Sequence, residues 1–222
     1  MTMQPPPRAA GAPKQTEKRQ QTIGDARKLV GEKKFDDAIK LLEPMSTGFK
    51  QDPEALFLLG IICEKQFNIP RAIEYAKQSL RIFDHADAHF LLARLHRTAG
   101  NTDDSIEAAQ KILAKLPDNE PASVVMGGAM EEGGRFDEAR AVIRPLIEAY
   151  AKKGTAAPPP VRFEWAKLCV HAKDYDAAIA EIDGLMEGEP DENLKRVAMH
   201  VKAKACDRSK RYADAVEAAG IA

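Results

Sequence analysis

The four residues Phe35-Asp36-Asp37-Ala38 form a short sequence unit that returns five times along the chain. The related stretches each end on a small residue, namely Ala72, Ser105, Ala139, Ala178 and Ala215. Successive small residues are 34, 33, 34, 39 and 37 positions apart. A period of this size is typical of a stack of repeated units rather than of one closed core. It therefore favours a binding surface over an enzyme pocket.

The apolar residues within these units have helical spacing. Leu56, Leu59, Gly60 and Cys63 follow the pattern i, i+3, i+4, i+7 of one helix face. Turn signals such as residues 99–101, Ala-Gly-Asn, separate pairs of such segments. No alternation is long enough to predict a strand. The sequence thus predicts an all-α fold of stacked helix–turn–helix repeats.

A second set of small residues lies twelve positions before the first in every unit. Its members are Ala26, Gly60, Ala93, Gly127, Ala166 and Ala203. With both sets in place, the pattern resembles the tetratricopeptide repeat, a helix–turn–helix unit of 34 residues, over about nine tenths of the chain. Numbered from the start of each repeat, the sets occupy positions 8 and 20. The resemblance implies a right-handed α-solenoid in which these positions meet where the paired helices cross.

The register divides the chain into a leader and about six repeats. Residues 1–18 are rich in Pro and Ala and are predicted to be disordered. An alternative reads Pro5-Pro6-Pro7-Arg8 as a ligand for a proline-binding module, but the composition favours a solvated leader. The repeats are predicted over residues 19–52, 53–85, 86–119, 120–153, 159–192 and 196–222, the last of them incomplete.

The longest interval, the 39 residues from Ala139 to Ala178, predicts a local departure from the regular repeat. Pro145 falls late in the second helix of the fourth repeat and is expected to kink or end it. The additional residues of this interval predict a longer loop after Tyr150 and a change of superhelix direction there.

Composition restricts the partners. The formal net charge is −1, from 33 basic and 34 acidic residues, so nothing favours nucleic acid or an anionic membrane surface. No segment approaches the roughly 20 apolar residues of a membrane-spanning helix. The first residues lack the apolar core of a signal peptide. The expected compartment is the cytoplasm.

The residues that invite a chemical function fall at packing positions. Cys63, Cys169 and Cys206 all take position 11 and are expected to be buried hydrophobes. His89 and His96 also take core-type positions, and no third ligand of the usual spacing accompanies them. No phosphate loop or catalytic motif is present. We therefore expect no metal, no cofactor and no catalysis within this chain.

The resemblance implies that the first helix of each repeat lines a concave groove. Position 5 places three aromatic rings there: Phe57, Phe90 and Phe163. Positions 9 and 12 add a mainly basic row, consisting of Arg27, Ile61, Arg94, Lys167, Lys204 and Arg97. Exposed apolar patches usually mark interaction sites, so we expect a peptide or helix with apolar anchors and some acidic groups. The alternative is that each Phe packs against the adjacent repeat.

The favoured function is therefore a non-catalytic protein–protein interaction scaffold. A first alternative is the N-terminal regulatory or oligomerising arm of a larger enzyme, for example a sulfotransferase or glycosyltransferase, continuing beyond Ala222. A second is a homo-oligomer in which the leader or an end helix of one copy occupies the groove of another. The clamp that binds chaperone tails in this family is missing, because Arg27 and Ile61 stand where it has asparagines.

Overall fold

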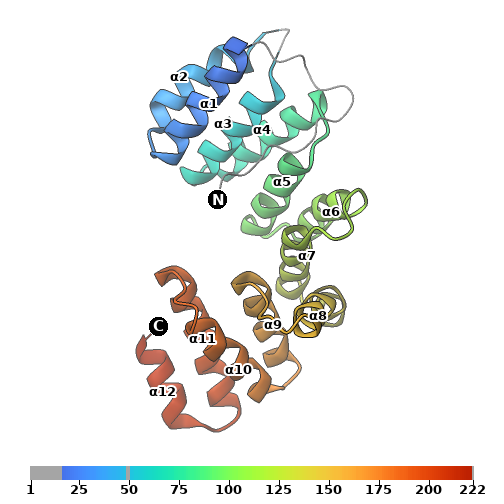
Figure 1. Cartoon of the computed structure of the whole chain (residues 1–222), viewed down its shortest axis with the longest axis vertical. Coiled ribbons are helices and arrows are strands. Elements are labelled where there is room, and N and C mark those ends of the chain that lie inside the picture. The colour runs from blue at the N-terminus through green and yellow to red at the C-terminus, as the bar shows by residue number, and fades with distance from the viewer. Residues whose placement is uncertain (1–16, 49–50, 222) are drawn as a thin grey trace. The chain divides into compact units, whose positions relative to one another are not determined.

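Twelve helices and no strand make up residues 17–48 and 51–221, which are the residues that the computed structural model describes (Figure 1). The helices alternate along the chain as A and B helices. The A helices are α1 (Glu17–Gly31), α3 (Pro53–Lys65), α5 (Ala86–Thr98), α7 (Glu120–Glu132), α9 (Pro159–His171) and α11 (Glu192–Arg208). The B helices are α2 (Phe35–Ser46), α4 (Ile69–Ile82), α6 (Thr102–Leu113), α8 (Phe136–Lys152), α10 (Tyr175–Met186) and α12 (Tyr212–Ile221).

The chain forms two compact units, the first ending at Asn101 and the second beginning at Thr102. In unit 1, α1 packs on α2 and α3 on α4, and the A helices α1, α3 and α5 are neighbours. In unit 2, α7, α9 and α11 pack on α8, α10 and α12 respectively, and α9 contacts both α7 and α11. The predicted all-α fold of stacked helix–turn–helix units is confirmed. Residues 1–16 of the predicted leader lie outside the described residues.

Close approach of paired helices occurs at the two sets of small residues. A methyl group on Gly60 would lie 3.4 Å from the backbone oxygen of Ala72, so positions 8 and 20 meet as predicted. In the first five repeats the residues at position 20 have no exposed surface: Ala38, Ala72, Ser105, Ala139 and Ala178. In the last repeat, Ala203 and Ala215 are only half-buried. The crossing is thus less completely buried in the last repeat than in the first five.

Each turn from an A to a B helix contains a residue with positive φ, between 59° and 77°. These residues are Lys33, Phe67, Gly100, Gly134, Lys173 and Lys210. The next N–H returns to the last helical turn, as from Asn68 to the carbonyl of Cys63 at 2.8 Å. Glycine adopts this conformation without strain, but four of the six turns carry a side chain. Packing of the helices therefore holds these turns.

Two sequence intervals exceed the common period, and helices rather than loops absorb both. α8 and α11 each contain 17 residues. The prediction for Pro145 was a kink or an end of the helix, and the end is wrong, because Pro145 lies inside α8, which continues to Lys152. The connection over residues 153–158 has the same length as that over residues 114–119. The prediction of a longer loop after Tyr150 is therefore also wrong.

The cores lie between the helices of each unit. The core of unit 1 is built around Leu42, Leu58 and Ile62, all with at most 2% exposure. In unit 2, Ile182 and Leu185 pack with the residues of α11. Within the described residues, no helix is both long enough and apolar enough to cross a bilayer.

Replacing two helical glycines with alanine tests the role of the close approach. A methyl group on Gly127 would lie 2.6 Å from Cγ1 of the fully buried Ile143, whereas one on Gly24 would meet nothing within 4 Å. Both variants gain about 1 kcal/mol of helix propensity, but only Gly127→Ala adds overpacking strain of about 1–3 kcal/mol. We expect urea unfolding followed by circular dichroism to give Gly127→Ala a free energy of unfolding that is lower than that of Gly24→Ala by about 1–3 kcal/mol. Equal stability gains in the two variants would contradict the account.

Candidate functional site

In unit 1, the A helices carry a partly exposed aromatic row. Phe57 on α3 and Phe90 on α5 are both half-buried. Ile23, at the equivalent position of α1, is buried at 4% exposure. Phe57 also packs against the core cluster, while the Arg94 guanidinium lies 5.6 Å from the centre of the Phe90 ring. Phe57 is therefore supported by the core, and both rings remain partly accessible.

In unit 2, the same register gives a less uniform row. Phe163 on α9 is half-buried, with the Lys167 ammonium 5.5 Å from its ring centre. Val124 on α7 is buried at 9% exposure, and His200 on α11 is exposed. We call the surface formed by positions 5, 9 and 12 of neighbouring A helices in one unit the A-helix face.

Most of the predicted basic row is engaged in ion pairs between neighbouring A helices. Arg27 on α1 contacts Glu54 on α3 at 2.8 Å, and Arg94 on α5 contacts Glu64 on α3. Lys204 on α11 is exposed and forms no ion pair with any described residue. Of the other predicted residues, Ile61 and Arg97 are half-buried. The sequence predicted a row of cations, and the structure adds the carboxylate partners of Arg27, Arg94 and Lys167.

The strongest of these pairings is a nearly buried cluster in unit 2. The Lys167 ammonium lies 2.8 Å from both Glu131 on α7 and Glu164 on α9, and the three side chains are 15%, 12% and 6% exposed. Burial alone would raise the pKa of Glu131, but the hydrogen bond and charge of Lys167 outweigh it and lower the pKa. Burial likewise works against the charge of Lys167, yet the two carboxylates raise its pKa. His171 adds a contact of 2.9 Å to Glu131.

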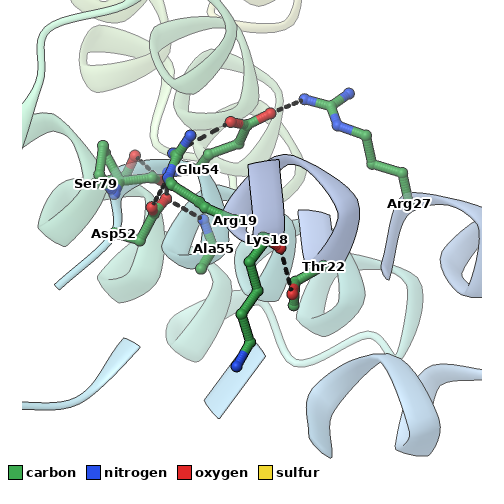
Figure 2. Close-up of polar contacts among 9 residues, drawn as sticks. Lys18, Arg19, Thr22, Arg27, Asp52, Glu54, Ala55 and Ser79 are labelled. Atoms are coloured by element: carbon green, nitrogen blue, oxygen red, sulfur yellow. Dashed lines mark hydrogen bonds and ion pairs between the residues drawn. The ribbon is translucent and has the colours of Figure 1, made fainter. Parts of the chain in front are cut away.

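A polar network ties α1 to the start of α3 in unit 1, as Figure 2 shows. Arg19 donates hydrogen bonds from Nε and Nη2 to the Asp52 carboxylate, and Nη2 also lies 3.3 Å from Glu54. Asp52 caps α3 by accepting hydrogen bonds from the N–H groups of Glu54 and Ala55 at 2.9 and 3.2 Å. Glu54 also forms an ion pair with Arg27 (Figure 2). This network fixes the spacing of the first two A helices.

A second network lies beneath Phe57. The Ser79 hydroxyl on α4 donates to the carbonyl of Pro53 at 2.6 Å, so at 3.0 Å it accepts from Nε2 of His85. The His85 ring meets Phe57 edge-on at 5.5 Å and stacks on Phe83 at 5.8 Å. Burial lowers the pKa of His85, which favours the neutral ring. His85 therefore supports the aromatic row rather than binding a ligand.

The cysteines and His89 also have structural roles. Cys63, Cys169 and Cys206 are buried free thiols, as predicted from their register. Burial raises the pKa of Cys169 to about 11, so this thiol is a poor nucleophile at neutral pH. His89 lies 2.7 Å from Asp84. Among residues 17–48 and 51–221, no group of three His, Cys, Asp or Glu side chains is arranged to hold a metal ion.

Three features were missed from the sequence. Phe67 in the turn after α3 is 90% exposed. A pocket of about 340 Å³ opens beside the start of α8, lined by Phe136, Arg140 and His171 among others. Arg208, at position 13 of the last repeat, is exposed on α11. Register analysis of position 13 could have found Arg208, whereas the pocket depends on side-chain packing.

Comparison with known proteins places this architecture. Residues 68–120 and 96–158 match two family models, both described as Tetratricopeptide repeat. No curated protein sequence matches the chain. The chain is similar to the structure of a tetratricopeptide repeat protein from Parabacteroides merdae ATCC 43184, with a TM-score of 0.71 and 16% identity over 90% of this chain and 76% of the other.

Two further structures are similar. For MamA (41-end) from Desulfovibrio magneticus RS-1, the TM-score is 0.65 at 15% identity, covering 78% of this chain and 96% of the other. For a chain of the APC/C hetero-tetramer Cut9-Hcn1, the TM-score is 0.72 at 16% identity, covering 87% of this chain and 37% of the other. At these identities the likeness shows the fold alone.

Replacing Lys167 tests the buried cluster. Lys167→Met keeps an aliphatic stem but leaves Glu131 and Glu164 without their shared cation. We expect the free energy of unfolding at pH 7 to fall by about 3 kcal/mol. Because folding lowers the pKa of Glu131, its contribution is present above the unfolded pKa and is lost as pH falls through the folded value. The difference in free energy of unfolding between the native chain and the variant should therefore decrease below about pH 4.

Lys152→Met is the matched control, since Lys152 is exposed at the end of α8. Thermal unfolding from pH 7 to pH 3 should show little change for this control. If the stability difference between the native chain and Lys167→Met stays constant over this pH range, the role of the two carboxylates is contradicted.

Proposed function

Since this chain is a tetratricopeptide repeat protein, matched by family models over residues 68–158, we propose that it is a non-catalytic scaffold that binds a peptide or helix of a partner protein on its A-helix face. The observation that carries the proposal is the half-buried state of Phe57, Phe90 and Phe163. Rings that served only as core would be covered, and contiguous exposed apolar surface usually marks an interaction site.

The arrangement around the rings supports a preformed surface. Phe57 rests on His85, and Phe90 lies beside the guanidinium of Arg94, which is itself held by Glu64. Side chains with few remaining rotamers lose less conformational entropy when a partner binds. Aromatic and Arg side chains are also the usual energetic centres of protein interfaces.

The chemistry of the described residues favours binding over catalysis. The thiols are buried, and the pKa of each is raised by that burial. The nearly buried cluster around Lys167 links helices α7 and α9 through ion pairs. The similar structures include a chain of a hetero-tetrameric assembly, which agrees with a scaffold role.

A double substitution in unit 1 tests the proposal. Phe57→Ala with Phe90→Ala should reduce the amount of partner retained in affinity capture at least tenfold, because each aromatic anchor usually contributes more than about 1 kcal/mol. Helical content by circular dichroism should be unchanged. Phe67→Ala, which removes a 90% exposed ring outside the aromatic row, should retain the partner fully.

Loss of helical content in the double variant would instead support the packing interpretation of these rings. To separate the two readings, Phe57→Leu with Phe90→Leu retains apolar bulk beneath the surface. Native stability together with native capture by this second variant would show that the aromatic rings are not the anchors.

A further inference from the structure

The cations of the A-helix face divide into two groups by their partners. Arg27, Arg94 and Lys167 each have a carboxylate within ion-pair distance on the neighbouring A helix. These charges are already compensated within the chain. A partner carboxylate would have to compete with them, and for the nearly buried Lys167 this would leave a buried charge unpaired.

α11 lacks this compensation. His200, Lys204 and Arg208 follow one another at one-turn intervals, are exposed, and form no ion pair with any residue in the described part of the chain. We call these three residues, the cations Lys204 and Arg208 together with the His200 imidazole, the α11 cation row. The register explains the difference, because position 12 of the preceding repeat is Glu64 or Glu131 opposite Arg94 and Lys167 but is Val170 opposite Lys204.

An apolar strip runs beside the α11 cation row. Val197 and Val201 are half-buried, and their spacing of 7 residues from Lys204 and Arg208 places each pair on one face of the helix. Val201 and Phe163 of the adjoining α9 both pack against the core cluster of unit 2. The surface therefore combines an apolar floor with cations along one side.

We propose that the α11 cation row docks an acidic amphipathic protein segment, one with two carboxylates a helical turn apart beside an aliphatic side chain. This inference rests on the proposed function and assigns the partner's chemistry. Lys204 and Arg208 lie four residues apart, about 6 Å along the helix axis, which matches carboxylates at the same spacing on a partner helix.

Charge complementarity favours a short acidic segment over a nucleic acid. Glu187, Glu189 and Asp191 are exposed immediately before α11 and would repel a long polyanion. Nucleic-acid affinity also depends on many phosphate contacts made together. The two cations Lys204 and Arg208 suit a partner with a few carboxylates.

The test uses the 222-residue chain and a short fluorescein-labelled helical peptide with two glutamates four positions apart beside leucine. A matched peptide carries glutamines in place of the glutamates. Fluorescence anisotropy should show the native chain binding the glutamate peptide about tenfold more tightly than the glutamine peptide, with affinity falling as salt is raised. Lys204→Gln with Arg208→Gln should remove that preference.

Lys77→Gln with Arg81→Gln is the matched control, because this pair on α4 has the same residue types, spacing and exposure. It should bind the glutamate peptide within twofold of the native chain. Equal binding of the two peptides by the native chain, or equal losses in the two double variants, would overturn the proposal. So would a single-stranded oligonucleotide that binds as tightly as the glutamate peptide and depends on the same two residues.

These outcomes are separate from those of the proposed function. The Phe57 and Phe90 variants alter unit 1 and are judged by capture of a partner. If the peptide test fails while capture of the partner still depends on these rings, the proposed acidic segment is wrong and the scaffold assignment stands. Loss of dependence on the rings would remove the scaffold assignment even if the peptide bound.

Discussion

Close approach of paired helices is the constraint on which the rest of this structure depends. At Gly60 the neighbouring helix backbone lies so near that an added methyl group would already be in van der Waals contact with it. Small side chains at positions 8 and 20 bring each A helix against its B helix, and the wider apolar faces then meet the next pair. Within each unit the A helices become neighbours as a result, and their polar and aromatic side chains meet on one face.

Electrostatic interactions extend this arrangement from one repeat to the next. The bonds of Arg19 and Arg27 to the start of α3, and of Lys167 to Glu131, each join consecutive A helices. Exposed pairs such as Arg27–Glu54 contribute little stability. The nearly buried cluster around Lys167 is different, since loss of one member would leave a desolvated charge. It therefore specifies the packing of α7 on α9 more than it adds net stability.

The sequence predicted what depends on register and missed what depends on side-chain partners. Burial of Cys63 and Cys169 followed from their position alone, because position 11 faces the core in each repeat. The pairing of Arg94 with Glu64 joins positions 9 and 12 of successive repeats, and no single-repeat pattern contains that relation. The extension of α8 past Pro145 was also missed. Past the proline, the Tyr150 hydroxyl donates to the Glu120 carboxylate on α7 at 2.7 Å, a side-chain contact that the repeat pattern does not contain.

The incomplete burial of Ala203 and Ala215 has a consequence for how the chain responds to ligands. In repeat proteins stability is roughly a sum of terms within and between neighbouring repeats, so a helix pair whose crossing is incompletely buried opens more readily than one whose crossing is fully buried. The α11 cation row lies on this pair. A molecule bound along α11 would cover this crossing further and suppress its opening, so that recognition and local folding would be thermodynamically linked in this pair of helices.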